Sequence, residues 1–210
     1  MGLLQTRPQT KIAMTTAFCD FMDEWNAVLN MTTPAHHRQI MNFLVDVLMH
    51  APHRGLLMAF RHSGKSTVVG IFAACVLCMH PEYRILILSA ESTLASRMVG
   101  HIRNILENHP RCADMIPTGR RAWACDRITI NRPVGIREPS VICAGIAGNI
   151  TGSRADLIIC DDVEVPNTCN TAQKRENLRE RLRELEFILS PTGTMIYRSE
   201  EHTSELQSRS

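Results

Sequence analysis

The segment Ala59–Ser66 holds the residues with the clearest chemical potential in this sequence. It follows a short apolar run, Leu56–Phe60, and precedes a longer one, Val68–Met79, so we expect a strand, a glycine-bearing loop and a helix. Backbone amides at such a loop and helix N-terminus direct partial positive charge at an anion. The Lys65 ammonium would contact the outer phosphates of a nucleotide, and the Ser66 hydroxyl would be a ligand for Mg²⁺. The segment departs from the common pattern at its first position, where alanine replaces glycine.

A second chemical element is the apolar run Leu157–Cys160, which leads directly into Asp161 and Asp162, with Glu164 two residues further on. Strands covered on both faces have continuous apolar runs of this kind. Carboxylates are costly inside a core, so we expect them at the carboxyl end of the strand, where open α/β sheets bind ligands. There Asp161 would hold Mg²⁺, directly or through water. The alternative is a parallel strand that ends in a solvated acidic turn, but the two motifs in this order predict a nucleotide hydrolase.

Composition is that of an ordinary globular domain, with 210 residues of which 44% are hydrophobic and 21% charged. The formal net charge of +2 is too small to argue for DNA binding by itself. The longest apolar run has the length of a buried helix rather than of a bilayer span, so no membrane association is expected. The start of the chain lacks the apolar region of a secretory leader.

The 8 cysteines raise the alternatives of a disulfide framework or a zinc site. Cys75 and Cys78 have CxxC spacing, but they lie within the apolar run that we expect to be helical. No second CxxC pair or spaced histidine pair accompanies them in the sequence. We therefore expect core thiols in a reducing cytosol.

Alternating helices and strands must position the two motifs. We expect further helices over residues 11–30, 33–50, 92–108 and 171–189, further strands over 84–90, 140–143 and 194–197, and two short strands around 127–130. This alternation predicts an α/β fold with a mostly parallel central sheet flanked by helices. Basic and acidic residues alternate along the helix over residues 171–189, which favours a solvated face over a DNA-binding surface.

The last residues, 198–210, differ from everything before them because they lack apolar periodicity. The run from Arg198 to Arg209 is what a common short-read sequencing adapter encodes when it is translated in frame, so we expect a non-native tail and a natural frame that ends near Tyr197. The alternative is a natural polar tail, which composition permits. The expected organisation is an N-terminal helical segment at 1–31, a nucleotide-hydrolase domain at 32–197 and the tail.

The chain resembles the ATPase half of the large terminase subunit of tailed bacteriophages, particularly short-tailed-phage-like members. The resemblance covers about Thr32 to Tyr197, and the motifs that carry it are Thr33–Gln39, Phe60–Ser66, Ile87–Ala90, Gly152–Asp156 and Asp161–Glu164. It implies a P-loop NTPase of the RecA/ASCE type that hydrolyses ATP with Mg²⁺ to drive double-stranded DNA into a preformed capsid. It also implies a portal protein, a terminase small subunit and further copies of the chain, in a ring on the procapsid, as partners in the cytoplasm of an infected bacterium.

The resemblance also implies roles for single residues. The nucleotide would contact Ala59, Arg61, His62, Ser63, Gly64, Lys65 and Ser66. Lys65 would bind the β- and γ-phosphates, while Ser66 and Asp161 would hold Mg²⁺. Asp162 or Glu164 would orient the attacking water, and the two share a side if the strand continues.

Four further positions, two arginines, a histidine and a glutamine, are open to two interpretations each. The loop residue Arg61 resembles an arginine that steadies charge on the γ-phosphate, and the alternative is an ion pair with a nearby acid. The family commonly has glutamine near His37, whereas here Gln39 lies two places later; either can contact adenine, or both can have capping or surface roles. Arg154 would sense nucleotide or DNA, or be a turn residue held by Asp156.

Parts of the family pattern do not occur in this sequence. In the family, a Gly-Thr-Pro-like coupling motif follows the strand that begins here at Thr194, and a nuclease domain with an acidic cluster comes later. This sequence ends before either of them. We therefore expect no DNA cleavage by this chain and an incomplete sheet. Alternatives to the packaging motor are a helicase-like or other nucleic-acid-stimulated ATPase, and a fragment that binds nucleotide or a capsid partner without turnover.

Overall fold

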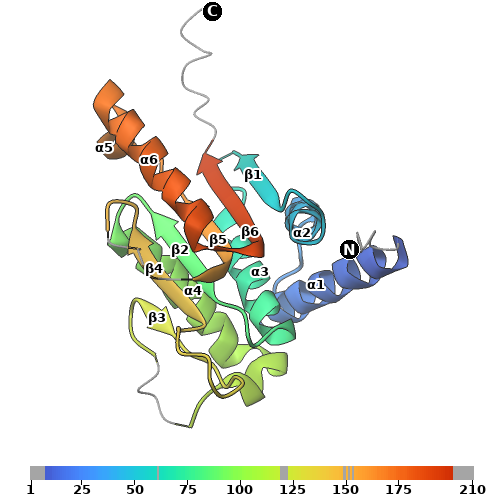
Figure 1. Cartoon of the computed structure of the whole chain (residues 1–210). Coiled ribbons are helices and arrows are strands. Elements are labelled where there is room, and N and C mark those ends of the chain that lie inside the picture. The colour runs from blue at the N-terminus through green and yellow to red at the C-terminus, as the bar shows by residue number, and fades with distance from the viewer. Residues whose placement is uncertain are drawn as a thin grey trace, which may run out of the picture.

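The computed structural model describes residues 8–60, 62–118, 123–148, 150, 152 and 154–200. Its helices are α1 (Pro8–Val28), α2 (Ala35–Met49), α3 (Lys65–Met79), α4 (Ser92–Asn108), the 3₁₀ helix η1 (Pro110–Met115), α5 (Pro166–Cys169) and α6 (Ala172–Ile188). Its strands are β1 (Arg54–Ala59), β2 (Ile85–Ser89), β3 (Arg127–Ile128), β4 (Val141–Gly145), β5 (Ala155–Asp161) and β6 (Leu189–Glu200). Figure 1 shows the strands as one central sheet with helices on both of its faces.

The sheet has the strand order β1-β6-β5-β2-β4-β3. Neighbouring strands are parallel except β3, which is antiparallel to β4. Every residue of β2 is buried, as expected for a strand with helices on both sides. The predicted α/β fold with a mostly parallel sheet is confirmed.

Each face of the sheet has its own hydrophobic core. Ile85 and Ile87 point to the core that contains apolar residues of α1, α2, α3 and α4. Leu86 and Leu88 point to the smaller core, against Leu178 and other residues of α6. The chain therefore forms three layers, and α1, which lies in the expected N-terminal segment, packs on the same core as α3, the helix that follows the predicted phosphate loop.

The helix α3 crosses the larger core and is buried on nearly all sides. Gly70 allows α4 to approach closely, because a Cβ there would lie 2.2 Å from Cδ2 of His101. All 8 cysteines are free thiols, with Cys75 buried and Cys78 half-buried in α3. Among the described residues, the helices include none that combines the length and the apolar character of a membrane span.

The carboxyl-terminal strand is longer than the sequence pattern indicated. The expected strand over 194–197 is part of β6, which begins at Leu189 and continues through Arg198 to Glu200. The extension has partners on both sides, since Arg198 is in register with Leu57 of β1 and with Asp161 of β5. The sheet ladder thus includes the first residues of the expected tail, and residues 201–210 lie outside the described part of the chain.

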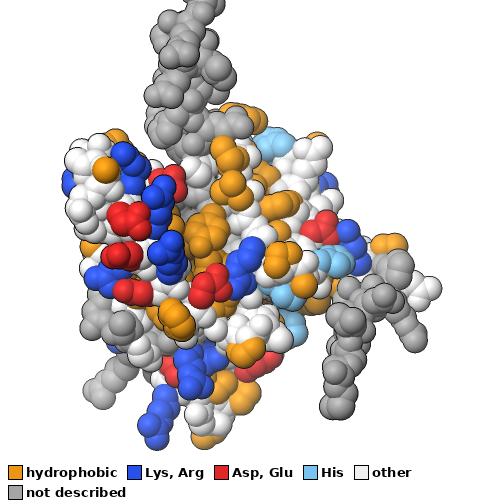
Figure 2. Space-filling view, turned by 45° about the horizontal axis from the view of Figure 1, so that its top comes forward, with side chains coloured by type: hydrophobic (Ala, Val, Ile, Leu, Met, Phe, Trp, Pro, Cys, Tyr) orange, Lys and Arg blue, Asp and Glu red, His pale blue; other side chains and the backbone are white. Residues whose placement is uncertain are grey.

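The helix α6 lies on the outside of the smaller core. Figure 2 shows basic and acidic side chains interleaved along it. Arg179 lies 3.1 Å from Glu176, and Arg181 lies 2.9 Å from Glu184, each pair one turn apart. These ion pairs match the solvated face that the charge pattern favours.

Candidate functional site

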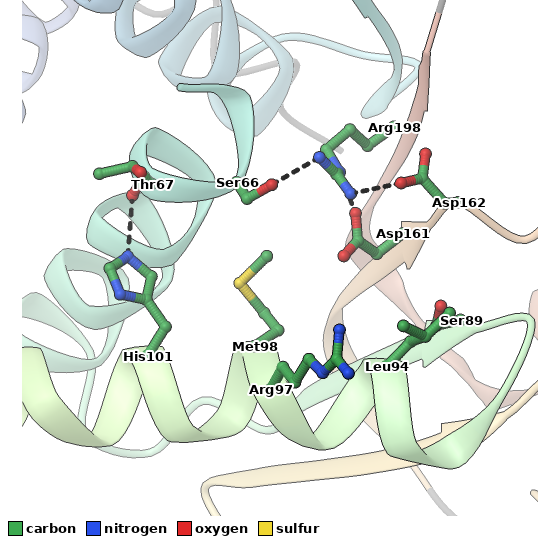
Figure 3. A pocket seen from close by; sticks show the side chains of 10 residues that line it. All are labelled: Ser66, Thr67, Ser89, Leu94, Arg97, Met98, His101, Asp161, Asp162 and Arg198. Atoms are coloured by element: carbon green, nitrogen blue, oxygen red, sulfur yellow. Dashed lines mark hydrogen bonds and ion pairs between the residues drawn. The ribbon is translucent and has the colours of Figure 1, made fainter. Parts of the chain in front are cut away.

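The phosphate-loop helix and the acidic strand meet at the carboxyl edge of the sheet (Figure 3). Ser66 stands in the first turn of α3, and Asp161 is the last residue of β5. Arg198 of β6 lies between them: its Nη1 donates a hydrogen bond of 2.6 Å to Ser66 Oγ, and its Nε donates to Asp161 Oδ1. Its Nη2 donates to Asp162 Oδ2 at 2.7 Å. The structure therefore brings Ser66, Asp161 and Asp162 together around one guanidinium.

These side chains line a cavity of about 300 Å³. Its walls come from α3, α4, β5, β6 and the end of β2, and α4 contributes Arg97 and His101. In Figure 3 the Arg97 side chain rises from α4 toward the side of the cavity where the two aspartates stand. The volume is at the lower end of the range for small-molecule sites.

The Lys65 side chain lies beneath the phosphate loop. It is 4% exposed, and its Nζ donates to the carbonyl oxygens of Ala59 and, at 2.8 Å, of Phe60. The preceding Gly64 has φ of 73°, in the left-handed region that favours glycine. A Cβ at Gly64 would also lie 2.2 Å from Nε2 of His37, so this position has no room for a side chain.

The N-terminus of α3 has features of an anion site. Within the described part of the chain no side chain caps it, so the amides of its first turn have no capping group there. Ser63 is 2% exposed, and among the described residues its Oγ has no hydrogen-bond partner. A buried hydroxyl without a partner is costly, and a phosphate oxygen is the kind of acceptor that would satisfy it.

His37 and Gln39 lie on the other side of the loop. His37 Nε2 is 3.1 Å from the Ser63 carbonyl oxygen. Burial lowers the pKa of His37 and nearby His36 lowers it further, while the Ser63 carbonyl opposes both effects. Gln39 is exposed and lines a second cavity of about 340 Å³, whose other walls are mainly apolar and include Phe60.

The backbone separates the two candidate water-orienting acids. β5 ends at Asp161, and Asp162 has φ of 46°, so the strand does not continue and the expected alternation of sides does not apply. Asp162 lines the cavity, whereas Glu164 is exposed and is not among the residues that line it. His62, in the phosphate loop, also has a positive φ, of 63°. Strained backbone of this kind clusters at functional sites.

The two candidate arginines are placed differently. Arg61 lies outside the described residues, so its role stays a prediction. Arg154 is exposed, and the acid proposed as its alternative partner, Asp156, instead binds Arg84 and Ser190. The interpretation of Arg154 as a turn residue held by Asp156 has no contact to support it.

Sequence reasoning missed Arg97, His101 and Arg198. A signal existed for the first two, because Leu94, Arg97, Met98 and His101 follow the helical spacing i, i+3, i+4 and i+7 and so share one face of α4. Arg198 had no local signal, since its place follows from strand register.

The site fits Mg²⁺ better than zinc. The described residues contain no group of three or more histidine, cysteine, aspartate or glutamate side chains that could hold a metal ion. Mg²⁺ usually binds through one or two protein oxygens together with waters and substrate phosphates. Ser66 Oγ and a carboxylate oxygen of Asp161, which bind the same guanidinium, provide such a pair.

Comparisons with known proteins agree on one family. Residues 56–194 match the family described as terminase large subunit, T4likevirus-type, N-terminal. The chain is 35% identical over 144 residues to the large terminase subunit of Enterobacteria phage T3. The aligned region covers 68% of this chain and 25% of that relative. The chain thus matches about a quarter of the length of this curated relative.

Two solved structures are also similar, both of the large terminase ATPase domain of Thermus phage P74-26. One has a TM-score of 0.48 and the other, a point variant, 0.47; each is 16% identical to this chain. Both matches cover 84% of this chain and 68% of the other.

Proposed function

The chain belongs to the terminase large subunit family, and on that premise we propose that it binds ATP with Mg²⁺ and hydrolyses it. The observation that carries this proposal is the meeting of Ser66, Asp161 and Asp162 at one cavity beside the N-terminus of α3. In the complete protein, hydrolysis would drive viral double-stranded DNA into a procapsid.

The phosphates would lie against the first turn of α3. The uncapped helix amides and the buried Ser63 hydroxyl would donate hydrogen bonds to phosphate oxygens. Lys65 Nζ would leave the carbonyl oxygens of Ala59 and Phe60 and bind the β- and γ-phosphates instead. Carbonyl oxygens are neutral, so an ammonium gains electrostatically when phosphate replaces them.

Ser66 and Asp161 would hold Mg²⁺, and the metal would neutralise charge that develops on the phosphates. Asp162 is placed to orient the attacking water because its carboxylate lines the same cavity. We assign this role to Asp162 in preference to Glu164, which is exposed outside the cavity. Arg97 and Arg61 would add positive charge near the γ-phosphate.

The base would occupy the second cavity, where Gln39 and His36 provide polar atoms and Phe60 an aromatic face. His37, which faces the Ser63 carbonyl, would support the loop rather than read the base. Ser63 lines the second cavity and Ser66 the first, so the phosphate loop separates the two.

The remaining functions belong to the whole protein. We propose that the complete chain acts with a portal protein, a small subunit and further copies of itself in a ring, on double-stranded DNA, in the cytoplasm of an infected bacterium. DNA cleavage would belong to a nuclease domain beyond the matched quarter of the relative. The tail at 198–210 we propose to be non-native, as its adapter-like sequence indicates.

Phosphate release by the chain tests the enzyme proposal. We expect Mg²⁺-dependent turnover in the parent chain and its loss in Lys65→Ala and Asp162→Asn. Lys11→Ala is a matched control, because Lys11 pairs with Asp46 at 2.6 Å on the surface, away from the cavity. Equal turnover in all four proteins would contradict hydrolysis at this site. If turnover requires DNA, and the protein moves along DNA without a procapsid, the result would favour the helicase-like alternative.

A further inference from the structure

We propose that Arg198 is an internal cation that occupies the Mg²⁺ position, so that Mg²⁺ binds only when the guanidinium leaves. The proposal rests on the proposed function, because it concerns the same ligands. It adds that this chain, as its sequence stands, carries a competitor for its own metal.

The contacts of Arg198 carry the inference. Its side chain is 8% exposed, and its three nitrogens each donate to a different group: Ser66 Oγ at 2.6 Å, Asp162 Oδ2 at 2.7 Å and Asp161 Oδ1. Guanidinium nitrogens are donors only. All three acceptors are oxygens that the proposed function assigns to the metal or to the attacking water.

Competition follows from charge. A guanidinium and Mg²⁺ would both place positive charge against the same hydroxyl and carboxylate oxygens. Two cations cannot occupy the same position, because they repel and because Asp161 is only 11% exposed. Metal binding at Ser66 and Asp161 therefore requires the guanidinium to give up these bonds.

The backbone cannot carry Arg198 away. β6 holds it in register between Leu57 of β1 and Asp161 of β5, and its carbonyl accepts a hydrogen bond from the Asp162 amide at 3.1 Å. Only side-chain rotation remains, and the cavity that Arg198 lines provides the space for it. The cost of separating a buried ion pair then weakens metal binding.

The family comparison does not extend to Arg198. The matched residues end at 194, and Arg198 is the first residue of the segment with adapter-like sequence. On the proposal that the tail is non-native, Arg198 is a foreign residue in the ladder of β6 at the point where the metal would bind.

Mg²⁺ alone, without nucleotide, is the probe for the test. We expect rising Mg²⁺ concentrations to raise the unfolding temperature of Arg198→Ala, with a half-maximal concentration at least about tenfold below that of the parent chain, because the variant has lost the competing charge. NaCl at matched ionic strength corrects for screening. Arg198→Gln, which keeps amide donors but no charge, should behave like Arg198→Ala and serves where the alanine variant does not fold.

Two controls make the outcome specific. Arg54→Ala removes an arginine that binds Glu186 at 2.6 Å outside the cavity, and it should respond to Mg²⁺ like the parent. Asp161→Asn combined with Arg198→Gln should lose the response. Equal responses in the parent and both Arg198 variants, or no response in the variants, would overturn the proposal.

A nucleotide titration separates this proposal from the ATPase proposal. With a fluorescent ATP analogue and Mg²⁺, Arg198→Gln should bind at least about tenfold more tightly than the parent, and the difference should vanish in EDTA. Equal affinity with Mg²⁺ rejects the internal cation but leaves nucleotide binding in place. A Mg²⁺ response in the variants without nucleotide binding by any protein rejects the ATPase and leaves the internal cation.

Discussion

The two ends of β5 carry the same pair of residue types in different settings. At the amino end, Asp156 binds Arg84 through Nε at 2.9 Å and Nη2 at 3.0 Å, and it accepts a further bond of 2.6 Å from Ser190. At the carboxyl end, Asp161 binds Arg198 beside the N-terminus of α3. The first pair joins the starts of three strands, whereas the second lines a cavity with the phosphate loop.

We infer from this comparison that position in the sheet, not residue type, decides whether an aspartate serves stability or the proposed chemistry. Both carboxylate oxygens of Asp156 accept hydrogen bonds, and no predicted site residue lines the hollow beside it. Asp161 instead stands where parallel strands bind ligands, at their carboxyl ends. We therefore expect the amino-end pair to govern stability and the carboxyl-end aspartate to govern chemistry.

The largest effect should come from Asp161→Ala, which removes the acidic residue that we propose as a metal ligand. We expect ATP turnover to fall roughly a hundredfold to a thousandfold, as when a main electrostatic contact of a transition state is lost. Phosphate-release kinetics at saturating ATP and Mg²⁺ measure this. Asp156→Ala, compared at a temperature where both variants are folded, should retain turnover, and equal losses in the two would break the distinction.

Arg84→Ala should have the largest effect on stability at the amino end. It leaves the Asp156 carboxylate, 22% exposed, without its main partner, and we expect the free energy of unfolding to fall by about 2 kcal/mol. Urea denaturation monitored by circular dichroism measures the change. Mg²⁺ should not restore the lost stability, because no metal ligand is predicted at this end; a Mg²⁺-dependent recovery would contradict the assignment.

Arg97→Ala tests whether the cavity at the carboxyl end uses a cation from α4. Loss of one charged hydrogen bond, about 1.5 kcal/mol, should lower turnover by about tenfold. Arg103→Ala is the matched control, since Arg103 lies on the same helix near Trp123 and should leave turnover unchanged. A loss in the control as large as in Arg97→Ala would indicate a general effect on α4.

Acid pH should weaken the amino-end pair. Burial raises the pKa of Asp156, but the hydrogen bonds from Arg84 and Ser190 lower it more, so its pKa in the folded chain lies below the ordinary value of 3.8. The pair therefore adds stability above the unfolded-state pKa and loses it as the pH falls through the folded-state pKa. Unfolding measured from pH 6 down to about pH 3 should show a smaller acid-induced loss in Asp156→Asn than in the parent.

The smallest effect should come from an exposed ion pair outside both regions. Arg179→Ala removes the contact with Glu176 on α6, where the Arg179 side chain is 66% exposed. We expect the free energy of unfolding to change by less than about 0.5 kcal/mol. A larger change would mean that α6 contributes more than a solvated cover.

Strong local patterns predicted most of the fold. The continuous apolar runs of β2 and β5 and the helical spacing of α4 gave these elements within a few residues of their observed bounds. The expected tail boundary at Arg198 is not a structural boundary, because β6 pairs with β5 as far as Arg198 and with β1 as far as Glu200. The choice between Asp162 and Glu164 was also beyond sequence, since it depends on the left-handed backbone at Asp162.

The sequence by itself determined which groups are present for chemistry: a glycine, a lysine and a serine after one apolar run, and two aspartates after another. Local patterns suffice for this, because phosphate loops and buried parallel strands use neighbouring residues. Only the tertiary structure decided that Arg97 faces the same cavity and that Arg198 lies on Asp161. Those contacts join residues far apart in the chain, and their geometry follows from helix packing and strand register, which no local pattern encodes.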